Sequence, residues 1–176
     1  DSAGSSTWLA TENMVVRQAG ARDNDSDQMV ELDVPQKVKS YSEFHTLRDR
    51  VSGKTMALDN TGALISEKLA TELGVQAGDS VDIYAQDAIG NPTGKAYRVR
   101  VAGVVENYVA HYVIMTPALY EKTFGEKASF TTLYASVKED EATRDKVSDD
   151  LLATDGVKTV SYNDETINSY RSMLKS

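Results

Sequence analysis

The chain has 176 residues, of which 40% are hydrophobic and 26% charged, with a formal net charge of -8 and no cysteine. This length allows one ordinary domain or two small subdomains. The absence of cysteine excludes disulfides, thiolate metal sites and cysteine nucleophiles, and the acidic balance argues against nucleic acid or anionic lipid as a partner. No apolar run reaches the roughly eighteen residues that a membrane-spanning helix needs.

The first third of the chain predicts a hairpin followed by a helix. Residues 7–18 and the alternating residues 29–34 are typical of two strands, and the loop that joins them is polar with an acidic tip. A capping box at Ser40 opens the segment 40–51, in which apolar residues recur at helical spacing. We therefore expect an amphipathic helix there, followed by a short strand over residues 55–58.

The middle of the chain predicts a helix and then a second hairpin. Apolar residues 63–65 lead to Ser66, which we expect to cap a helix that ends at Gly74. Two strands follow over residues 80–85 and 95–105. Because each strand has one apolar face, the strands need a common core, and we expect a small twisted or partly closed sheet.

The segment 112–125 carries the clearest local signals. A short strand over residues 112–115 stops at Thr116, which suits a helix cap, and Pro117 suits the first helical position. Gly125 supplies the left-handed residue that favours a helix end. These signals predict a helix between Thr116 and Gly125.

The last third predicts a β-α-β unit and a final helix. A strand over residues 131–137, a highly charged helix over 139–154 and a strand over 157–162 follow one another. A helix that begins near Asn163 meets no glycine or proline stop. We therefore expect this helix to continue to the end of the chain, and the chain to be an excised piece of a longer protein.

Two patterns suggest metal sites, and both are incomplete. Residues 23–27 place oxygen ligands at alternate positions, as at the start of a calcium loop. Gln28 stands where the glycine should be and Val34 where the glutamate should be, so we expect a solvated hairpin tip. Neither His45 nor His111 has a second histidine within reach, so we expect no zinc site and a solvated His45.

The sequence offers little for catalysis. It contains no Gly-x-Ser-x-Gly elbow and no glycine cluster that could hold a phosphate. Asp79 and Glu106 stand at a turn and a strand end, where catalytic acids can lie, but Asp79 is better explained as holding its own turn. We therefore expect no catalytic, cofactor-binding or metal-binding residue, and no cofactor.

One turn is rich in aromatic residues. Its members Asn107, Tyr108, His111 and Tyr112 form a candidate contact surface for a partner. The alternative is that the aromatic side chains of this turn cover an edge of the core, which is common for half-buried tyrosine and histidine.

Three segments together resemble a known family. They read VAGVVENYVAHYVIMTPALYEKTFG, preceded by ISEKLATELGVQAGDSV and followed by VKTVSYNDETINSYRSMLKS. In order and spacing they resemble the large extracytoplasmic domain of FtsX/MacB-type ABC transporter permeases, particularly the long Gram-positive ones. The resemblance covers roughly residues 41–176.

The resemblance implies an α+β fold with two lobes. An α/β lobe, with the β-α-β unit and the C-terminal helix, would come from the chain ends, residues 1–27 with 129–176. A β-rich lobe with short helices would come from residues 28–128.

The resemblance also implies a non-catalytic domain on the extracytoplasmic side of the cell membrane, next to transmembrane helices that lie outside this chain. Its partners would be a cognate cytoplasmic ATPase subunit, acting through the membrane part of the permease, and an extracellular protein or peptide. One alternative is a ligand-sensing domain of a permease that confers resistance to peptide antibiotics. Another is a soluble enzyme, which would need a pocket where titratable groups with perturbed pKa values converge.

Overall fold

The computed structural model of the chain describes residues 3–22, 26–45, 47–106, 110–137 and 141–153. The described elements are β1 (Ala3–Gln18), β2 (Gln28–Pro35), α1 (Val38–Phe44), β3 (Ala63–Ser66), α2 (Glu67–Leu73), β4 (Ser80–Gln86), β5 (Pro92–Val105), β6 (Tyr112–Ile114), α3 (Pro117–Phe124), β7 (Thr132–Val137) and α4 (Glu141–Leu152).

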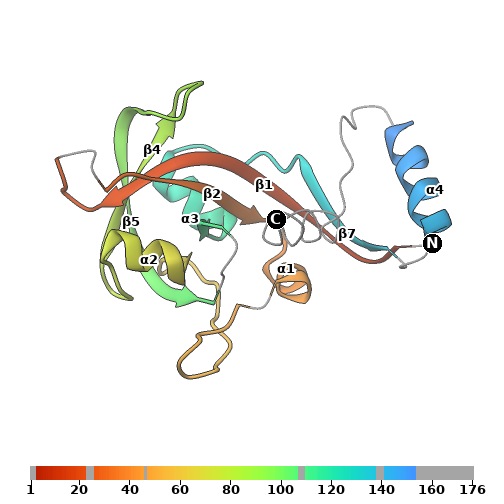
Figure 1. The fold of residues 1–176 in the computed structure, drawn as a ribbon, viewed down its shortest axis with the longest axis horizontal. Coiled ribbons are helices and arrows are strands. Elements are labelled where there is room, and N and C mark those ends of the chain that lie inside the picture. The colour runs from red at the N-terminus through yellow and green to blue at the C-terminus, as the bar shows by residue number, and fades with distance from the viewer. Residues whose placement is uncertain (1–2, 23–25, 46, 107–109, 138–140, 154–176) are drawn as a thin grey trace, which may run out of the picture. The chain divides into compact units, whose positions relative to one another are not determined.

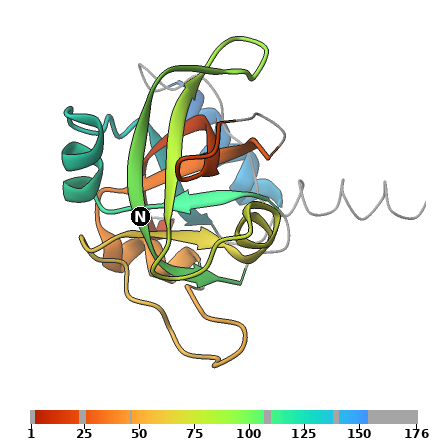
Figure 2. The same ribbon diagram turned by 90° about the vertical axis from the view of Figure 1, so that its left-hand side faces the viewer.

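Six of the strands close into a barrel (Figures 1 and 2). Their order is β2-β6-β3-β5-β4-β1, and pairing of β1 with β2 completes the ring, while β7 is a further neighbour of β1. The length of β1 makes closure feasible, because its residues 9–16 pair with β2 and its residues 14–18 pair with β4. The expected partly closed sheet is thus a closed barrel, and both expected hairpins are confirmed.

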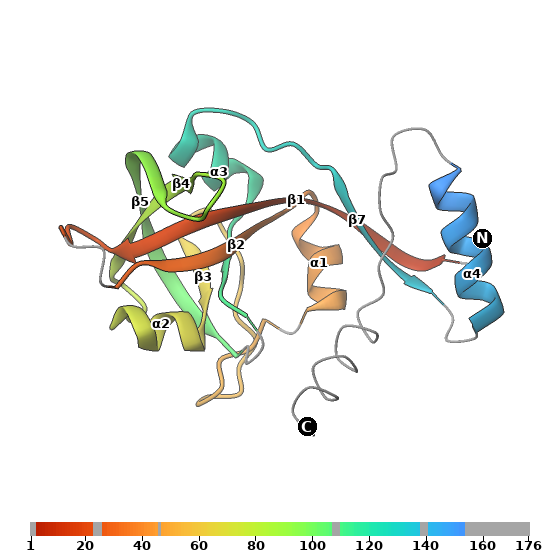
Figure 3. The same ribbon diagram turned by 45° about the horizontal axis from the view of Figure 1, so that its top comes forward.

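The barrel interior is the larger of two apolar cores. Because side chains alternate along a strand, Val30, Leu32 and Val34 of β2 point inward. The other five strands of the ring also contribute buried apolar side chains to this core. Helices α2 and α3 lie on opposite sides of the strands in Figures 2 and 3. Each helix adds buried apolar side chains to this core, among them Leu69 from α2 and Leu119 from α3.

Helix α3 forms as its sequence predicts. The Thr116 hydroxyl accepts a hydrogen bond from the backbone N–H of Leu119 at 3.1 Å, and Pro117 occupies the first turn. Gly125 ends the helix with a φ of 77°, the left-handed conformation that glycine adopts at low cost. The signals at both ends are local, which explains why the prediction succeeds.

Helix α2 begins after Ser66 and ends at Gly74, as expected, but Ser66 does not cap it with its side chain. The Ser66 hydroxyl instead accepts a hydrogen bond from the backbone N–H of Tyr112 at 3.0 Å. The side chain of Ser66, which the sequence predicts to cap α2, therefore connects the end of β3 to the start of β6 through this hydrogen bond.

The prediction of a helix over residues 40–51 is wrong about where the helix ends. Helix α1 ends at Phe44, and His45 is already extended. Leu47 is buried, and its carbonyl accepts a hydrogen bond from the backbone N–H of Met56 at 2.7 Å. The strand expected over 55–58 is reduced to a single bridge at Thr55, because this segment folds back as a loop over the outside of the barrel.

The chain divides into two compact units. Ser5–Ala135 forms the unit with the barrel, and Asp1–Gly4 with Ser136–Ser176 forms the other. In the second unit, α4 lies where the charged helix is expected, while the strand expected over 157–162 and the helix from Asn163 lie outside the described residues.

The α+β class is confirmed. The division into an α/β lobe of residues 1–27 with 129–176 and a β-rich lobe of residues 28–128 stays a prediction. Residues 9–18, which that division places in the α/β lobe, pair with β2 and β4 in the barrel. Across the described parts of the chain, none of the helices has both the length and the apolar character needed to span a bilayer.

Candidate functional site

A second, outer core lies on the outside of the barrel strands, beneath α1 and the loop that follows it. Leu64 on β3 and Ile114 on β6 point into this outer core, whereas their neighbours Ile65 and Val113 point into the barrel. Period-two alternation of the strands separates the two cores. The buried members of the outer core are Leu9, Tyr41, Leu47, Leu58, Leu64, Val105 and Ile114.

A carboxyl group is buried at the edge of this outer core. Leu32 and Val34 face the barrel interior, so alternation turns Asp33 outward toward α1. Asp33 is only 1% exposed. The Tyr41 hydroxyl donates a hydrogen bond to Asp33 Oδ2 at 3.0 Å, whereas Asp33 Oδ1 is buried without a hydrogen bond from the described residues.

Burial perturbs the titration of Asp33. Loss of solvation, reinforced by the negative charge of Glu31, raises the pKa of Asp33 from 3.8 to about 8, although the hydrogen bond from Tyr41 opposes this shift. Burial, with the Asp33 charge as a second cause, also raises the pKa of Tyr41 above its ordinary value. At neutral pH both groups therefore hold their protons for most of the time.

Aromatic rings surround the Asp33–Tyr41 pair. The His45 ring stacks on the Tyr41 ring with a centroid distance of 4.5 Å and meets the Tyr134 ring edge-on at 5.6 Å. Burial lowers the pKa of His45 below 6.5, so the ring is neutral at pH 7. Burial also raises the pKa of Tyr134 to about 12, with the charge of Asp33 as a second cause.

The rings of Tyr41 and His45 border a small cavity that we call the aromatic pocket. Its volume is about 180 Å³. It is lined by Tyr41, Phe44, His45, Leu47, Val105, Glu106, Tyr112 and Ile114. Helix α1, the loop after it and the ends of β5 and β6 all contribute, so segments that are distant in sequence form the pocket.

An ion pair lies at the rim of the aromatic pocket. Arg48 Nη2 donates a hydrogen bond to Glu106 Oε2 at 3.1 Å, and the Glu106 backbone N–H donates to the Arg48 carbonyl at 2.8 Å. The Arg48 side chain is half exposed. Glu106, considered above as a candidate catalytic acid, is therefore paired with a guanidinium group.

The arrangement meets only part of what an enzyme would need. Titratable groups with shifted pKa values converge beside a pocket, as in many active sites. However, Asp33 is not among the residues that line the pocket, and the lining contains no serine or threonine among its described residues. The site can hold a proton at Asp33 and bind a small group beside Tyr41.

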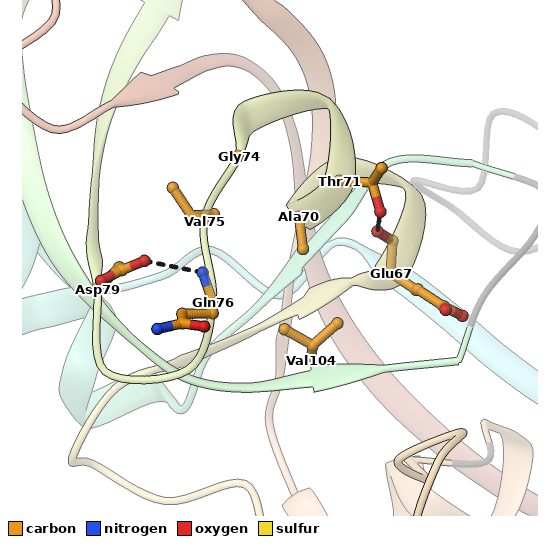
Figure 4. Close-up of a pocket in the computed structure, with 8 residues that line it drawn as sticks. All are labelled: Glu67, Ala70, Thr71, Gly74, Val75, Gln76, Asp79 and Val104. Atoms are coloured by element: carbon orange, nitrogen blue, oxygen red, sulfur yellow. Dashed lines mark hydrogen bonds between the residues drawn. The ribbon is translucent and has the colours of Figure 1, made fainter.

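A second hollow of about 480 Å³ lies beside α2 (Figure 4). Ala70 points toward Val104 across it, while Glu67 and Asp79 stand at opposite ends. Asp79 Oδ2 accepts a hydrogen bond from the Gln76 backbone N–H at 2.9 Å, which confirms that this aspartate holds its own turn. The carboxylate is thus occupied within the turn.

The structure separates the residues predicted to contact a partner. Tyr112 lines the aromatic pocket, whereas His111 Nε2 lies 3.3 Å from Glu72 Oε2 of α2, without hydrogen-bond geometry. Asn107 and Tyr108 lie outside the described residues. The contact surface of these four residues stays a prediction.

The prediction of a solvated His45 is wrong. His45 is half-buried, and its Nε2 makes no hydrogen bond within the described part of the chain, because the end of α1 turns the ring onto Tyr41. At the hairpin tip, the Asp27 carboxylate binds the Arg17 guanidinium at 2.6 and 2.8 Å. Among the described residues no group of three or more histidine, aspartate and glutamate side chains could hold a metal ion.

Sequence reasoning missed Asp33. The available signal was an acidic residue inside the alternating strand MVELDV, shortly before a helix that carries Tyr41. An outward-facing acid on a strand is ordinarily solvated. Only the packing of α1 over β2 buries it.

Solved structures have the same fold. The extracellular domain of the ABC-type transporter YknZ from Gram-positive bacteria matches with a TM-score of 0.53 and 16% identity, over 84% of this chain and 72% of that one. The periplasmic region of MacB from Actinobacillus actinomycetemcomitans also matches with a TM-score of 0.53, at 12% identity, over 98% of this chain and 77% of that one. Neither a protein-family model nor a curated protein matches the sequence.

The comparisons define the class of fold. The chain has the fold of extracytoplasmic domains of ABC transporter permeases, as its three characteristic segments predict. At this level of identity the likeness concerns the fold, and function requires a separate argument.

Proposed function

We propose that the chain is a non-catalytic extracytoplasmic domain of an ABC transporter permease. In this proposal the domain couples motion driven by a cognate cytoplasmic ATPase to an extracellular substrate or partner. The observation that carries the proposal is the fold match to two such domains over 84% and 98% of the chain. Transmembrane helices that flank the domain in the full-length protein would connect it to the ATPase, and the chain ends would form the lobe nearer the membrane.

The pocket geometry favours a protein partner over a sensed antibiotic. Sites for drug-sized ligands typically enclose about 300–1,000 Å³. The aromatic pocket, at about 180 Å³, is smaller than this range. The hollow beside α2 is large enough, but no aromatic side chain is among its described lining residues.

A soluble enzyme is the second candidate, and the buried Asp33–Tyr41 pair is the observation that favours it. Its weakness is that Asp33 does not reach the pocket lining. An enzyme would have to open this region before Asp33 could exchange a proton with a substrate.

Purification of the full-length protein from its native membranes tests the proposal. We expect the protein to fractionate with the membrane and to copurify with an ATPase subunit whose ATP hydrolysis is inhibited by vanadate. A variant such as Tyr112→Ala should copurify equally well, because the ATPase contacts the membrane part of the permease. Recovery in the soluble fraction without an ATPase would refute the proposal and favour the enzyme.

A further inference from the structure

We propose that the aromatic pocket is a binding site for an arginine side chain of a partner polypeptide. Four of its lining residues are aromatic, namely Tyr41, Phe44, His45 and Tyr112. A guanidinium group stacks on aromatic faces and is weakly hydrated, so it enters such a site more readily than an ammonium group does.

The charge of the site complements a cation. Glu106 lines the pocket, and no lysine or arginine is among the described lining residues. The chain as a whole has a formal net charge of -8. An incoming guanidinium group would therefore meet negative potential, with Arg48 at the rim as its competitor for Glu106.

Arg48 of the chain itself shows how a guanidinium group can bind Glu106 at the rim of the pocket. Its guanidinium group already donates a hydrogen bond to Glu106 Oε2 at the rim, at 3.1 Å, with the side chain half exposed. A second guanidinium group could displace Arg48 from Glu106, because an ion pair between solvent-exposed side chains contributes little net stability. Arg48 is thus a competitor whose removal should strengthen binding.

The pocket also has a suitable volume. The volume of about 180 Å³ equals that of roughly six water molecules in the liquid, which suits one side-chain head and excludes a folded segment.

A pair of matched probes tests this inference on the 176-residue chain, independently of the proposed transport function. Nα-acetyl-arginine methylamide carries the cation, and the corresponding citrulline compound is its neutral isostere. Titration at pH 7.5 and low salt, followed by amide chemical shifts in NMR spectra, should show saturable binding of the arginine probe. We expect the citrulline probe to bind roughly fivefold more weakly or worse.

Three variants locate the site. Glu106→Gln should weaken binding of the arginine probe by roughly fivefold, and Arg48→Gln should strengthen it. Glu121→Gln removes the same charge from an exposed position on α3, so its affinity should match that of the unsubstituted chain. Melting curves would establish that every variant is folded before its affinity is compared.

Several results would overturn the inference. These are equal binding of the two probes, an unchanged affinity in Glu106→Gln, or shifts that map away from the aromatic pocket. Failure of the arginine probe to saturate either the unsubstituted chain or Arg48→Gln would also overturn it.

Discussion

Replacing Asp33 with asparagine should remove a pH dependence of stability that the buried carboxyl creates. The pKa of Asp33 is 3.8 in an ordinary setting and about 8 in the folded chain. A raised folded-state pKa contributes stability that is fully present below pH 3.8 and is lost as the pH rises through about 8. Between pH 7 and pH 9 the unfolded chain keeps Asp33 ionised, whereas the folded chain releases its proton.

The magnitude follows from the same linkage. A group with a folded-state pKa near 8 changes the unfolding equilibrium about tenfold between pH 7 and pH 9, which is about 1.4 kcal/mol. For a chain of this length the melting temperature should fall by roughly 3 to 6 °C. His45, whose pKa is lowered by burial, is neutral in the folded state across this window and contributes little.

Urea unfolding at several pH values between 7 and 9 measures the effect. The unsubstituted chain should lose about 1.4 kcal/mol, and Asp33→Asn should show an almost flat profile. Asp82→Asn is the matched control, because a hydrogen bond from Arg98 lowers the pKa of Asp82 and its stabilising effect is lost only in acid. This control should be less stable than the unsubstituted chain yet keep its slope, and an equal slope in Asp33→Asn would refute the reasoning.

Further predictions concern packing and ligands. Phe124 is half-buried against the rings of Tyr97 and Tyr120 at 4.8 and 4.7 Å, so Phe124→Ala should cost about 2 kcal/mol in urea unfolding, less than full burial implies; an unchanged midpoint would show that α3 is peripheral. Gly62→Ala should lower the free energy of unfolding by about 3 kcal/mol, because its Cβ would lie 2.5 Å from the Arg100 carbonyl oxygen. Gly103→Ala should lower it less, because its Cβ mainly meets the flexible end of a methionine side chain. Equal losses of stability in the two variants would contradict this reasoning. Calcium, zinc and ATP should leave the melting temperature unchanged, and a saturable rise toward the ~2.7 kcal/mol expected at about 100 times the dissociation constant would reveal a missed site.

Local signals explain which elements the sequence predicts well. Thr116, Pro117 and Gly125 act within one helix, so their sequence pattern determines α3 without help from the rest of the fold. The segment after Phe44 behaves differently, because its helical periodicity competes with burial of Leu47 in the outer core. Tertiary contacts override propensity there.

The candidate site depends on contacts that are distant in sequence. Asp33 on β2 meets Tyr41 eight residues later, whereas Tyr112 and Tyr134, which pack against the same outer core, come from β6 and β7. Barrel closure sets these neighbours through strand register, which a single sequence does not reveal. The sequence predicted a partner contact at Tyr112, which lines the aromatic pocket, and it missed Asp33 and the half-buried His45.

Labelling of intact cells tests the proposed extracytoplasmic location most directly. The chain has no cysteine, so one introduced thiol is unique within it. Val51→Cys places the thiol at a side chain that is 95% exposed, and Val81→Cys places it at a core position that is 0% exposed, with the unsubstituted full-length protein as the blank. We predict that a membrane-impermeant maleimide labels Val51→Cys on intact cells and labels Val81→Cys only after denaturation; labelling of Val51→Cys only after the cells are broken would contradict the account.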